Sequence, residues 1–247
     1  TKRSKKKEKM LDESNWYRSL PDRLKIFTPR IFATHNEKST AAYELEFYGY
    51  PSLADLYTFG DESTPVWDLI IQRLLDIHAV FRQFQRRVSY PAYHDMYVKK
   101  TLERLKQLQS NLYWKRVLNY DDITVNGESL KNIKTLFDRL PHLVRTLHRE
   151  TADDMAIIHG DLCLSNILCD VNNLLVKFID PRGSFGARSI YGDQKYDLAK
   201  LRHSFHGNYD FIIADLFSLK ESGPVFEFQM HIDDKHREIA LRFDEAL

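Results

Sequence analysis

The scarcest residue in this chain is cysteine, with only Cys163 and Cys169 among 247 residues. Two cysteines six positions apart do not form a disulfide framework, so reduced thiols and a cytoplasmic location are expected. No apolar run approaches the roughly 20 residues that a membrane-spanning helix needs. The basic start, TKRSKKKEK, is not followed by the apolar segment of a secretory signal. The sequence therefore predicts neither a signal peptide nor a membrane span.

An excess of charge of one sign is also absent. Lys and Arg total 36 against 35 Asp and Glu, and this net charge of +1 gives no overall field that would attract nucleic acid or an anionic membrane. The length allows one large domain, or a small lobe followed by a larger one. The basic start itself is expected to be a solvated tail or the beginning of a helix.

Hydrophobic periodicity predicts an α+β chain with a short mixed start, a mainly helical body and a strand pair near its centre. Helices are predicted over residues 5–19, 51–57, 64–87, 95–117, 130–150, 194–205 and 237–247, with an interruption near Pro141 left open. Hairpins are predicted over residues 29–50, 123–129 and 167–180. No internal repeat and no low-complexity linker is present.

One stretch, IIHGDLCLSNILCDVNNLLVKFIDPRG at residues 157–183, places polar residues at the ends of two strand-like segments. The segments NILCD and LLVKFID are predicted to form a hairpin that brings Asn166 close to Asp180. Asp161 lies five residues before Asn166, on the same loop. The sequence therefore predicts two carboxylates and one carboxamide around a single cavity.

These three side chains offer oxygen ligands, which suit a hard cation such as Mg²⁺ and not zinc. Two carboxylates held together without a cation or a shared proton are costly. For each residue alone the simpler interpretation is a turn residue that caps local backbone groups. The joint spacing, H-x-D-x(4)-N and then I-D fourteen residues later, is much harder to explain by turn chemistry.

That spacing resembles the catalytic loop and metal-binding aspartate of the protein-kinase-like fold. Glycine follows the histidine where protein kinases have arginine, so the chain is more similar to the aminoglycoside phosphotransferase and choline kinase family of small-molecule kinases. The segments IDPRG, YGDQKYDLAKL and HSFHGNYD look closest to kinase domains of bacterial capsule and surface-polysaccharide biosynthesis proteins. The resemblance is specific over residues 155–210, looser over 10–60 and weak in the helical middle.

The resemblance implies a role for each matching residue. Asp161 matches the catalytic aspartate that orients the attacking hydroxyl and accepts its proton. Asn166 and Asp180 match the two Mg²⁺ ligands, the second of which bridges the metal to the β- and γ-phosphates of ATP. His159 matches a loop histidine that packs and hydrogen-bonds and is not itself reactive. Asp197 matches a helix aspartate that supports the backbone of the catalytic loop.

The nucleotide side is expected in a partial N-terminal lobe, residues 1–50, with residues 51–247 as the helical C-lobe. A kinase of this fold needs a lysine for the phosphates and a helix glutamate that holds it. Our candidates for this pair are Lys2 and Glu13, although both also fit surface charges of a basic helix. The chain contains no G-x-G-x-x-G phosphate loop, so either upstream sequence supplies one or the chain closes over ATP differently. Glu46, Phe47 and Tyr48 resemble the hinge that approaches the adenine, although their alternation also fits an edge strand.

Several other polar residues have two interpretations. Arg182, two positions after Asp180, could contact a phosphate or an acceptor carboxylate, or pair with Asp161 or Asp193. Asp193 is also expected to cap the following helix. A last group, His203, His206 and Tyr209, could line the acceptor pocket or pack on a helix face.

These observations predict an ATP- and Mg²⁺-dependent kinase acting on a hydroxyl of a sugar, polyol or amino alcohol for surface-polysaccharide biosynthesis. A nucleotidyltransferase domain or partner enzyme is a further expectation. Two alternatives remain open, namely a catalytically silent pseudokinase that acts as a binding scaffold, and an antibiotic phosphotransferase. The basic DPRG segment argues mildly against the second, because such enzymes often use an acidic pocket for cationic drugs. The sequence names neither the acceptor nor the oligomeric state.

Overall fold

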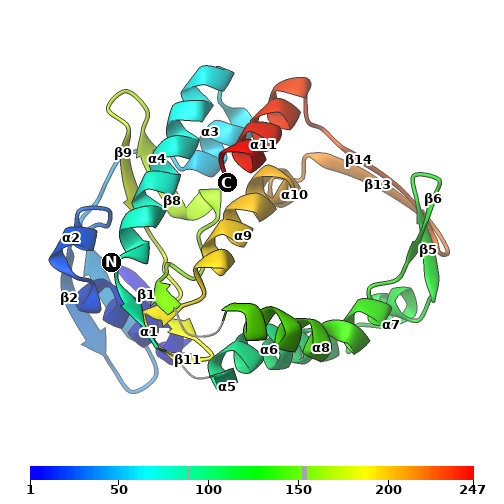
Figure 1. Ribbon diagram of the computed structural model, residues 1–247, viewed down its shortest axis with the longest axis horizontal. Helices are drawn as coiled ribbons and strands as arrows, with labels where there is room; N and C mark the ends of the chain where they lie inside the picture. Colours follow the sequence, from blue (N-terminus) through cyan, green and yellow to red (C-terminus); the bar gives the residue numbers. More distant parts are fainter. Residues whose placement is uncertain (88–89, 152–154) are drawn as a thin grey trace.

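The N-terminal region is a three-stranded antiparallel sheet with a helix packed on it. The computed structural model describes residues 1–87, 90–151 and 155–247. The sheet has the strand order β1-β3-β2, and α1 packs against β3 (Figure 1). The elements are β1 (Lys2–Ser4), α1 (Lys7–Ser19), α2 (Asp22–Lys25), β2 (Ile31–Asn36) and β3 (Ala41–Leu45). The helix predicted over residues 5–19 and the hairpin predicted over 29–50 are confirmed.

Aromatic side chains of α1 join this region to the rest of the core. Trp16 is fully buried, and its Nε1–H donates to the carbonyl oxygen of Ile158 at 2.6 Å. The same hydrophobic cluster extends to Phe205 and Phe243 near the end of the chain. One continuous core therefore crosses the boundary expected after residue 50, and the division into two lobes stays a prediction.

Helices form most of the C-terminal part, and two of them, α4 and α9, pack against α11. The helices of this group are α3 (Leu53–Phe59), α4 (Thr64–Arg82), α9 (Gln194–Phe205), α10 (Tyr209–Ile213) and α11 (Asp234–Ala246). Ser52 sets the start of α3, because its Oγ accepts the Asp55 N–H at 3.1 Å. The helix predicted over residues 64–87 is too long, since its last residues form strand β4 (Gln85–Arg86).

The single helix predicted over residues 95–117 is wrong. The segment consists of a π-helix, η1 (His94–Lys99), followed by α6 (Lys100–Leu108) and α7 (Leu112–Leu118), and is preceded by α5 (Tyr90–Tyr93). The break has a local cause at Asn111, whose side-chain oxygen accepts the Tyr113 N–H at 3.0 Å. Asparagine favours the N-cap position, so it starts a new helix instead of continuing the old one.

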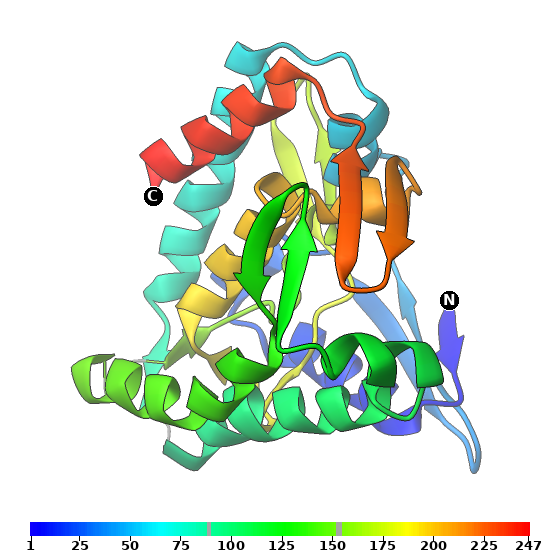
Figure 2. The same cartoon turned by 90° about the vertical axis from the view of Figure 1, so that its right-hand side faces the viewer.

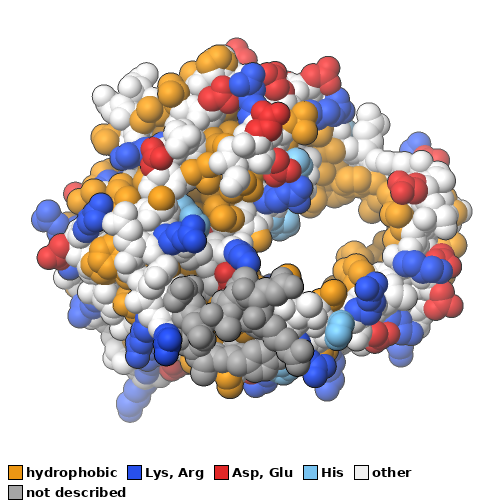
Figure 3. Space-filling model, viewed as in Figure 1, with side chains coloured by type: hydrophobic (Ala, Val, Ile, Leu, Met, Phe, Trp, Pro, Cys, Tyr) orange, Lys and Arg blue, Asp and Glu red, His pale blue; other side chains and the backbone are white. Residues whose placement is uncertain are grey.

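A four-stranded sheet, built from two hairpins distant in sequence, lies apart from the body at the right of Figure 1, and Figure 2 shows its strands from the front. Its elements are β5 (Asp122–Val125), β6 (Glu128–Lys131), β13 (Phe217–Ser222) and β14 (Val225–Met230). The hairpin predicted over residues 123–129 is confirmed, with Asn126 and Gly127 at positive φ. The pairing of β14 with β5 is parallel, and the β13–β14 hairpin was not predicted. Figure 3 shows an opening between this sheet and the body.

Short strands and loops at the centre carry the motif residues. They are β7 (Met155–Ile157), the 3₁₀ helix η2 (Leu164–Asn166), β8 (Ile167–Asp170), β9 (Leu175–Phe178), β10 (Ser184–Phe185), β11 (Ala187–Arg188) and β12 (Tyr191–Gly192). Strands β8 and β9 pair as the hairpin predicted over residues 167–180. The helix α8 (Lys134–Thr151) continues through Pro141 without interruption. Among the described helices, none is long and apolar enough to cross a membrane.

Candidate active site

The backbone of the His-Gly-Asp loop is held by Asp197 from helix α9. The carboxylate of Asp197 accepts the N–H of His159 at 2.7 Å and the N–H of Gly160 at 2.8 Å. Asp197 is almost fully buried, and burial raises the pKa of its carboxyl to about 7 although the two N–H donors act in the opposite direction. The loop support predicted for Asp197 is therefore present.

Glycine at position 160 has a structural cause. Its φ is +78°, which L side chains rarely adopt, and a Cβ there would lie 2.9 Å from Cβ of Arg182. The Arg182 N–H also donates to the carbonyl oxygen of His159 at 2.9 Å. The glycine lets the Asp-Pro-Arg-Gly loop cross directly over the His-Gly-Asp loop, where the arginine of protein kinases would not fit.

His159 is a buried packing residue. Its Nε2–H donates to the carbonyl oxygen of Ile179 at 2.8 Å, and its ring makes edge contacts with Trp16 and Phe178. Burial lowers the pKa of the imidazole to about 4, although neighbouring acids oppose the shift. A neutral histidine fixed in this way agrees with the packing and hydrogen-bonding role expected from the sequence.

The β8–β9 hairpin brings Asn166 and Asp180 to one end, as predicted. The Ile179 N–H donates to the carbonyl oxygen of Asn166 at 2.9 Å, which closes that end of the hairpin. The side-chain amide of Asn166 donates to the carbonyl oxygen of Asp161 at 2.8 Å. Asp180 has φ +56°, a left-handed conformation that is uncommon for a residue other than glycine and clusters at functional sites. The role of Asn166 and Asp180 as metal ligands stays a prediction.

Lys2 contacts two acids at once. Its Nζ lies 2.9 Å from Oε2 of Glu13 and 2.9 Å from Oδ1 of Asp180. Glu13 is fully buried in α1, where the Tyr43 hydroxyl also donates to it at 2.6 Å. Burial alone would lower the pKa of Lys2, but its bonds to Glu13 and Asp180 raise it above the usual value. The lysine–glutamate pair expected from the sequence is thus formed, and it reaches the predicted metal aspartate.

Asp161 has an ion-pair partner that sequence reasoning missed. Lys200 Nζ lies 3.0 Å from Oδ1 of Asp161. Burial alone would raise the pKa of Asp161, but Lys200 and then Arg182 outweigh it and hold the pKa below its usual value. The sequence did contain a signal for this contact. Lys200 follows Asp197 by three residues, so both side chains lie on the same face of α9, toward the His-Gly-Asp loop.

The ion pairs expected for Arg182 are not formed in the part of the chain that the structure describes. Its guanidinium instead donates to the Tyr196 hydroxyl at 3.2 Å and lies 3.5 Å from Met96 Sδ. Asp193 caps α9 as predicted, accepting the Lys195 N–H at 3.0 Å. The expectation that Arg182 pairs with Asp161 or Asp193 is therefore wrong.

The three expected hinge residues do not share one environment. Glu46 accepts the Tyr48 hydroxyl at 3.0 Å, and both residues line a second cavity of about 540 Å³. Phe47 is 89% exposed and does not line that cavity. An approach of Glu46, Phe47 and Tyr48 to adenine stays a prediction.

The three residues suggested for the acceptor pocket also separate. The ring of His203 packs against the ring of Tyr209, with centroids 4.6 Å apart and planes tilted by 33°. The Nε2 atom of His206 lies 2.9 Å from Oδ2 of Asp244. None of the three lines the cavity of about 610 Å³ that contains Asp161, Asp180 and Arg182. Packing explains His203 and Tyr209 better than a direct contact with the acceptor.

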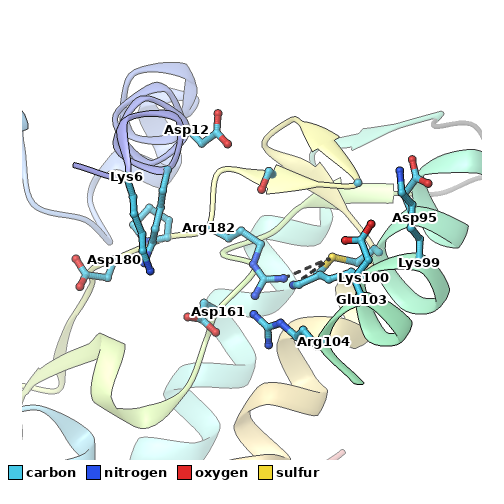
Figure 4. Close-up of a pocket in the computed structure, with 15 residues that line it drawn as sticks. Lys6, Asp12, Asp95, Lys99, Lys100, Glu103, Arg104, Asp161, Asp180 and Arg182 are labelled. Atoms are coloured by element: carbon cyan, nitrogen blue, oxygen red, sulfur yellow. Dashed lines mark hydrogen bonds between the residues drawn. The ribbon is translucent and has the colours of Figure 1, made fainter. Parts of the chain in front are cut away.

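That cavity lies between the His-Gly-Asp loop, the start of α1 and the helices η1 and α6 (Figure 4). Its lining is rich in charge and contains Asp161 and Asp180 together with the cations Lys6, Lys9, Lys99, Lys100, Arg104 and Arg182. Such an arrangement can orient a polar molecule beside an ionised aspartate. The cavity has room for a hydroxyl group next to the Asp161 carboxylate.

No known protein-family model matches the chain, and no curated protein matches it in sequence. A solved structure described as an aminoglycoside-3'-phosphotransferase of type VIII is similar in structure, with a TM-score of 0.47 and 15% sequence identity. The similarity covers 97% of this chain and 81% of that one. A likeness this distant says nothing of activity, so the function must be argued from the geometry of the site.

Proposed function

We propose that the protein transfers the γ-phosphoryl group of ATP to a hydroxyl of a small molecule. The observation that carries the proposal is the position of Lys2, 2.9 Å from both Glu13 and Asp180. In kinases a lysine held by a helix glutamate contacts the nucleotide phosphates, and an aspartate beside it holds the metal.

Asp161 acts as the residue that orients the attacking hydroxyl. Its lowered pKa keeps the carboxylate ionised at neutral pH, so it can accept a hydrogen bond from the hydroxyl and then its proton. Lys200 holds this carboxylate in place from α9. His159 stays neutral and fixes the loop, and it takes no part in proton transfer.

The residues at the hairpin end fit Mg²⁺ in the form in which kinases use it. Asn166 and Asp180 offer oxygen donors, and the described residues contain no cluster of three His, Cys, Asp or Glu that could hold a metal without help. Mg²⁺ is commonly held by one or two protein groups together with substrate phosphates. When bound there, the ion would neutralise the phosphate charge that develops during transfer.

For the acceptor we propose a sugar, polyol or amino alcohol, and for the biological setting surface-polysaccharide biosynthesis in the cytoplasm. The motif segments after Asp180 support this setting by resemblance alone. A nucleotidyltransferase domain or enzyme as a partner belongs to the same proposal. The two cysteines are free and buried, which agrees with a reducing compartment.

A melting experiment on the Asp180→Ala variant tests the metal–nucleotide site. Melting curves of wild type and variant are recorded with ATP alone and with ATP plus Mg²⁺. A ligand at about 100 times its Kd adds about 2.7 kcal/mol of apparent stability, so Mg²⁺ should add a large increment only to the wild type. Asp121→Ala, an exposed acid distant from the site, is the matched control. An equal Mg²⁺ increment in the wild type and Asp180→Ala would remove the basis of the proposal.

The Asp161→Asn variant separates an enzyme from a scaffold. Asparagine keeps the size of the side chain and removes the proton acceptor, so ATP binding should persist while turnover falls by about 100-fold or more. Turnover is followed by ATP consumption with a panel of sugars and polyols. A scaffold would bind ATP equally well in both proteins and turn over in neither.

A further inference from the structure

Three cationic side chains form the wall of the Asp161 cavity that lies away from Asp180. We call Lys100, Arg104 and Arg182 the cationic wall. All three line the cavity of about 610 Å³. Figure 4 shows them together on one side of Asp161, with Asp180 on the other side. Asp180 and the cationic wall therefore lie on opposite sides of Asp161, and Lys6 lines the cavity on the side of Asp180.

The cationic wall lacks carboxylate partners. Lys100 Nζ lies 3.8 Å from Met96 Sδ, and a guanidinium nitrogen of Arg182 lies 3.5 Å from the same sulfur. A thioether is a weak acceptor and cannot neutralise two cations. Within residues 1–87, 90–151 and 155–247, neither of them nor Arg104 forms an ion pair with an acid. The positive charge is thus available to a ligand.

Holding these cations together has an energetic cost. Lys100 and Arg104 are four residues apart on α6, and like charges at that spacing repel. Burial, followed by the charges of Arg182 and Arg104, lowers the pKa of Lys100 to about 8. An arrangement that is unfavourable without a counter-charge becomes favourable when an anion binds between its members.

Acids do line the same cavity, but they do not neutralise the wall. Asp12, Asp95 and Glu103 are among the lining residues. Asp12 pairs instead with Arg188, outside the wall. Neither Asp95 nor Glu103 forms an ion pair with the wall in the described ranges, and the Asp161 carboxylate is engaged by Lys200 at 3.0 Å.

The nucleotide phosphates are a poor explanation for this wall. Under the proposed function they lie beside Lys2 and Asp180, which already contact each other at 2.9 Å. The wall lies across Asp161 from Asp180 (Figure 4). In-line transfer puts the leaving group and the attacking group on opposite sides of the phosphorus, so the far side of Asp161 belongs to the acceptor.

We infer that the acceptor is an acidic hydroxyl compound, whose carboxylate or phosphate monoester binds to Lys100, Arg104 and Arg182 while its hydroxyl points to Asp161. This inference rests on the proposed function and narrows its acceptor class. Arg182 offers a planar donor pair suited to either acid, and the two side chains of α6 add charge. A cationic amino alcohol would be repelled by the same three residues.

The transfer balances with these groups alone. The acceptor oxygen forms a bond to the γ-phosphorus as the bond from that phosphorus to the β-bridging oxygen breaks, and ADP leaves with the bond electrons. The hydroxyl proton passes to Asp161. The products are ADP and an acceptor that bears its original acid and a new phosphate ester.

Titration calorimetry with three-carbon probes tests the inference. D-glycerate carries the carboxylate and glycerol 3-phosphate the phosphate, while glycerol is the neutral control and serinol the cationic one. Each probe is titrated into the free protein and into the protein loaded with Mg²⁺ and a non-hydrolysable ATP analogue. At least one acid should bind the loaded protein with a Kd of about 1 mM or tighter. Glycerol and serinol should bind at least about tenfold more weakly, since they lack the acid group that would form charge-assisted hydrogen bonds with the wall.

Variants assign the binding to the wall. Lys100→Met and Arg182→Met should each raise the Kd of the acid by about tenfold, because each removes a charge-assisted contact. Lys106→Met, on the same helix but outside the cavity, is the matched control and should leave the Kd unchanged. Because Lys100 is on the helix and Arg182 on the loop, a folding defect in one variant leaves the other as a test.

The outcomes separate this inference from the proposed function. Failure of the ATP analogue to bind, with acid binding retained in the free protein, would overturn the kinase and keep the anion site. Analogue binding with no acid binding, or acid binding unaffected by Lys100→Met and Arg182→Met, would overturn the inference alone. Loss of acid binding on loading would assign the wall to the nucleotide phosphates and would also overturn it. A tighter Kd for D-glycerate or for glycerol 3-phosphate identifies the acid.

Discussion

Lys200 Nζ lies 3.0 Å from Oδ1 of Asp161, so the carboxylate proposed to receive the hydroxyl proton is ion-paired by a residue of helix α9. The pair explains how a half-buried aspartate stays ionised, because burial alone would raise its pKa. It also makes the pH dependence of the reaction sensitive to a residue that does not contact the nucleotide.

Lys200→Met should move the acid limb of the pH–rate profile to higher pH. Without the ammonium group the pKa of Asp161 rises, and the carboxylate is lost at a higher pH. The measurement is kcat/KM between pH 4 and 8 for wild type and variant. Lys195→Met, on the exposed side of the same helix, is the control and should keep the wild-type limb. An unmoved limb in Lys200→Met would mean that another group controls the profile.

His159→Gln should reduce the loss of unfolding free energy that the wild type shows as the pH falls below neutrality. The folded imidazole has a pKa of about 4 against an ordinary value of 6.5. A depressed pKa contributes stability that is present above pH 6.5 and lost as the pH falls toward 4. Between pH 7 and pH 4.5 the wild type should lose about 2.4 kcal/mol of unfolding free energy that the variant does not lose. Urea unfolding at pH 7 and pH 4.5 measures the difference, with the exposed His142→Gln as control.

Lys100 should become chemically reactive near pH 8. Its pKa of about 8 means that the nucleophilic neutral amine forms above that pH and the inert ammonium below it. Trace acetylation at a series of pH values, read by mass spectrometry, gives the midpoint of its reactivity. Lys106 on the same helix is the internal reference. A midpoint for Lys100 near the ordinary value of 10.5 would show that burial and the charges of Arg182 and Arg104 do not lower its pKa.

Gly160→Ala and Gly127→Ala separate backbone strain from steric overlap. Both glycines have positive φ, +78° and +84°, so each alanine costs about 1 kcal/mol or more of strain. A Cβ at position 160 meets Cβ of Arg182 at 2.9 Å, whereas nothing lies within 4 Å of one at position 127. Gly160→Ala should therefore lose more unfolding free energy in urea and should also lose activity. Equal losses at the two positions would contradict the close crossing of the two loops.

Residues within one short segment were predicted well from the sequence. The hairpin around Asn172 and Asn173, the cap at Asp193 and the pairing of Lys2 with Glu13 all depend on local spacing or on a single recognised motif. The partners of Arg182 were not predictable in this way. They come from η1 and α9, and only the packing of those elements brings Met96 and Tyr196 to the guanidinium.

The errors in the middle of the chain have two different causes. The Tyr113 N–H donates to the side-chain oxygen of Asn111, and this cap starts a new helix where the hydrophobic pattern alone would continue the old one. The cationic wall was missed because Lys100 and Arg104 lie in a segment with weak resemblance, and nothing in their spacing shows that they face Asp161. Tertiary packing decides that the wall faces Asp161, whereas the break at Asn111 is a local cap, and hydrophobic periodicity reports neither.

The parallel pairing of Thr124 in β5 with Val225 in β14 bears on the order in which the chain folds. The two residues lie about 100 positions apart. The chain therefore loses conformational entropy on closing that loop before the strand pairing can stabilise it. The pairing should therefore form after the helices of the core and open before them. Hydrogen exchange should show β5 and β14 amides exchanging through a partial opening, while amides of α4 and α9 exchange only on global unfolding.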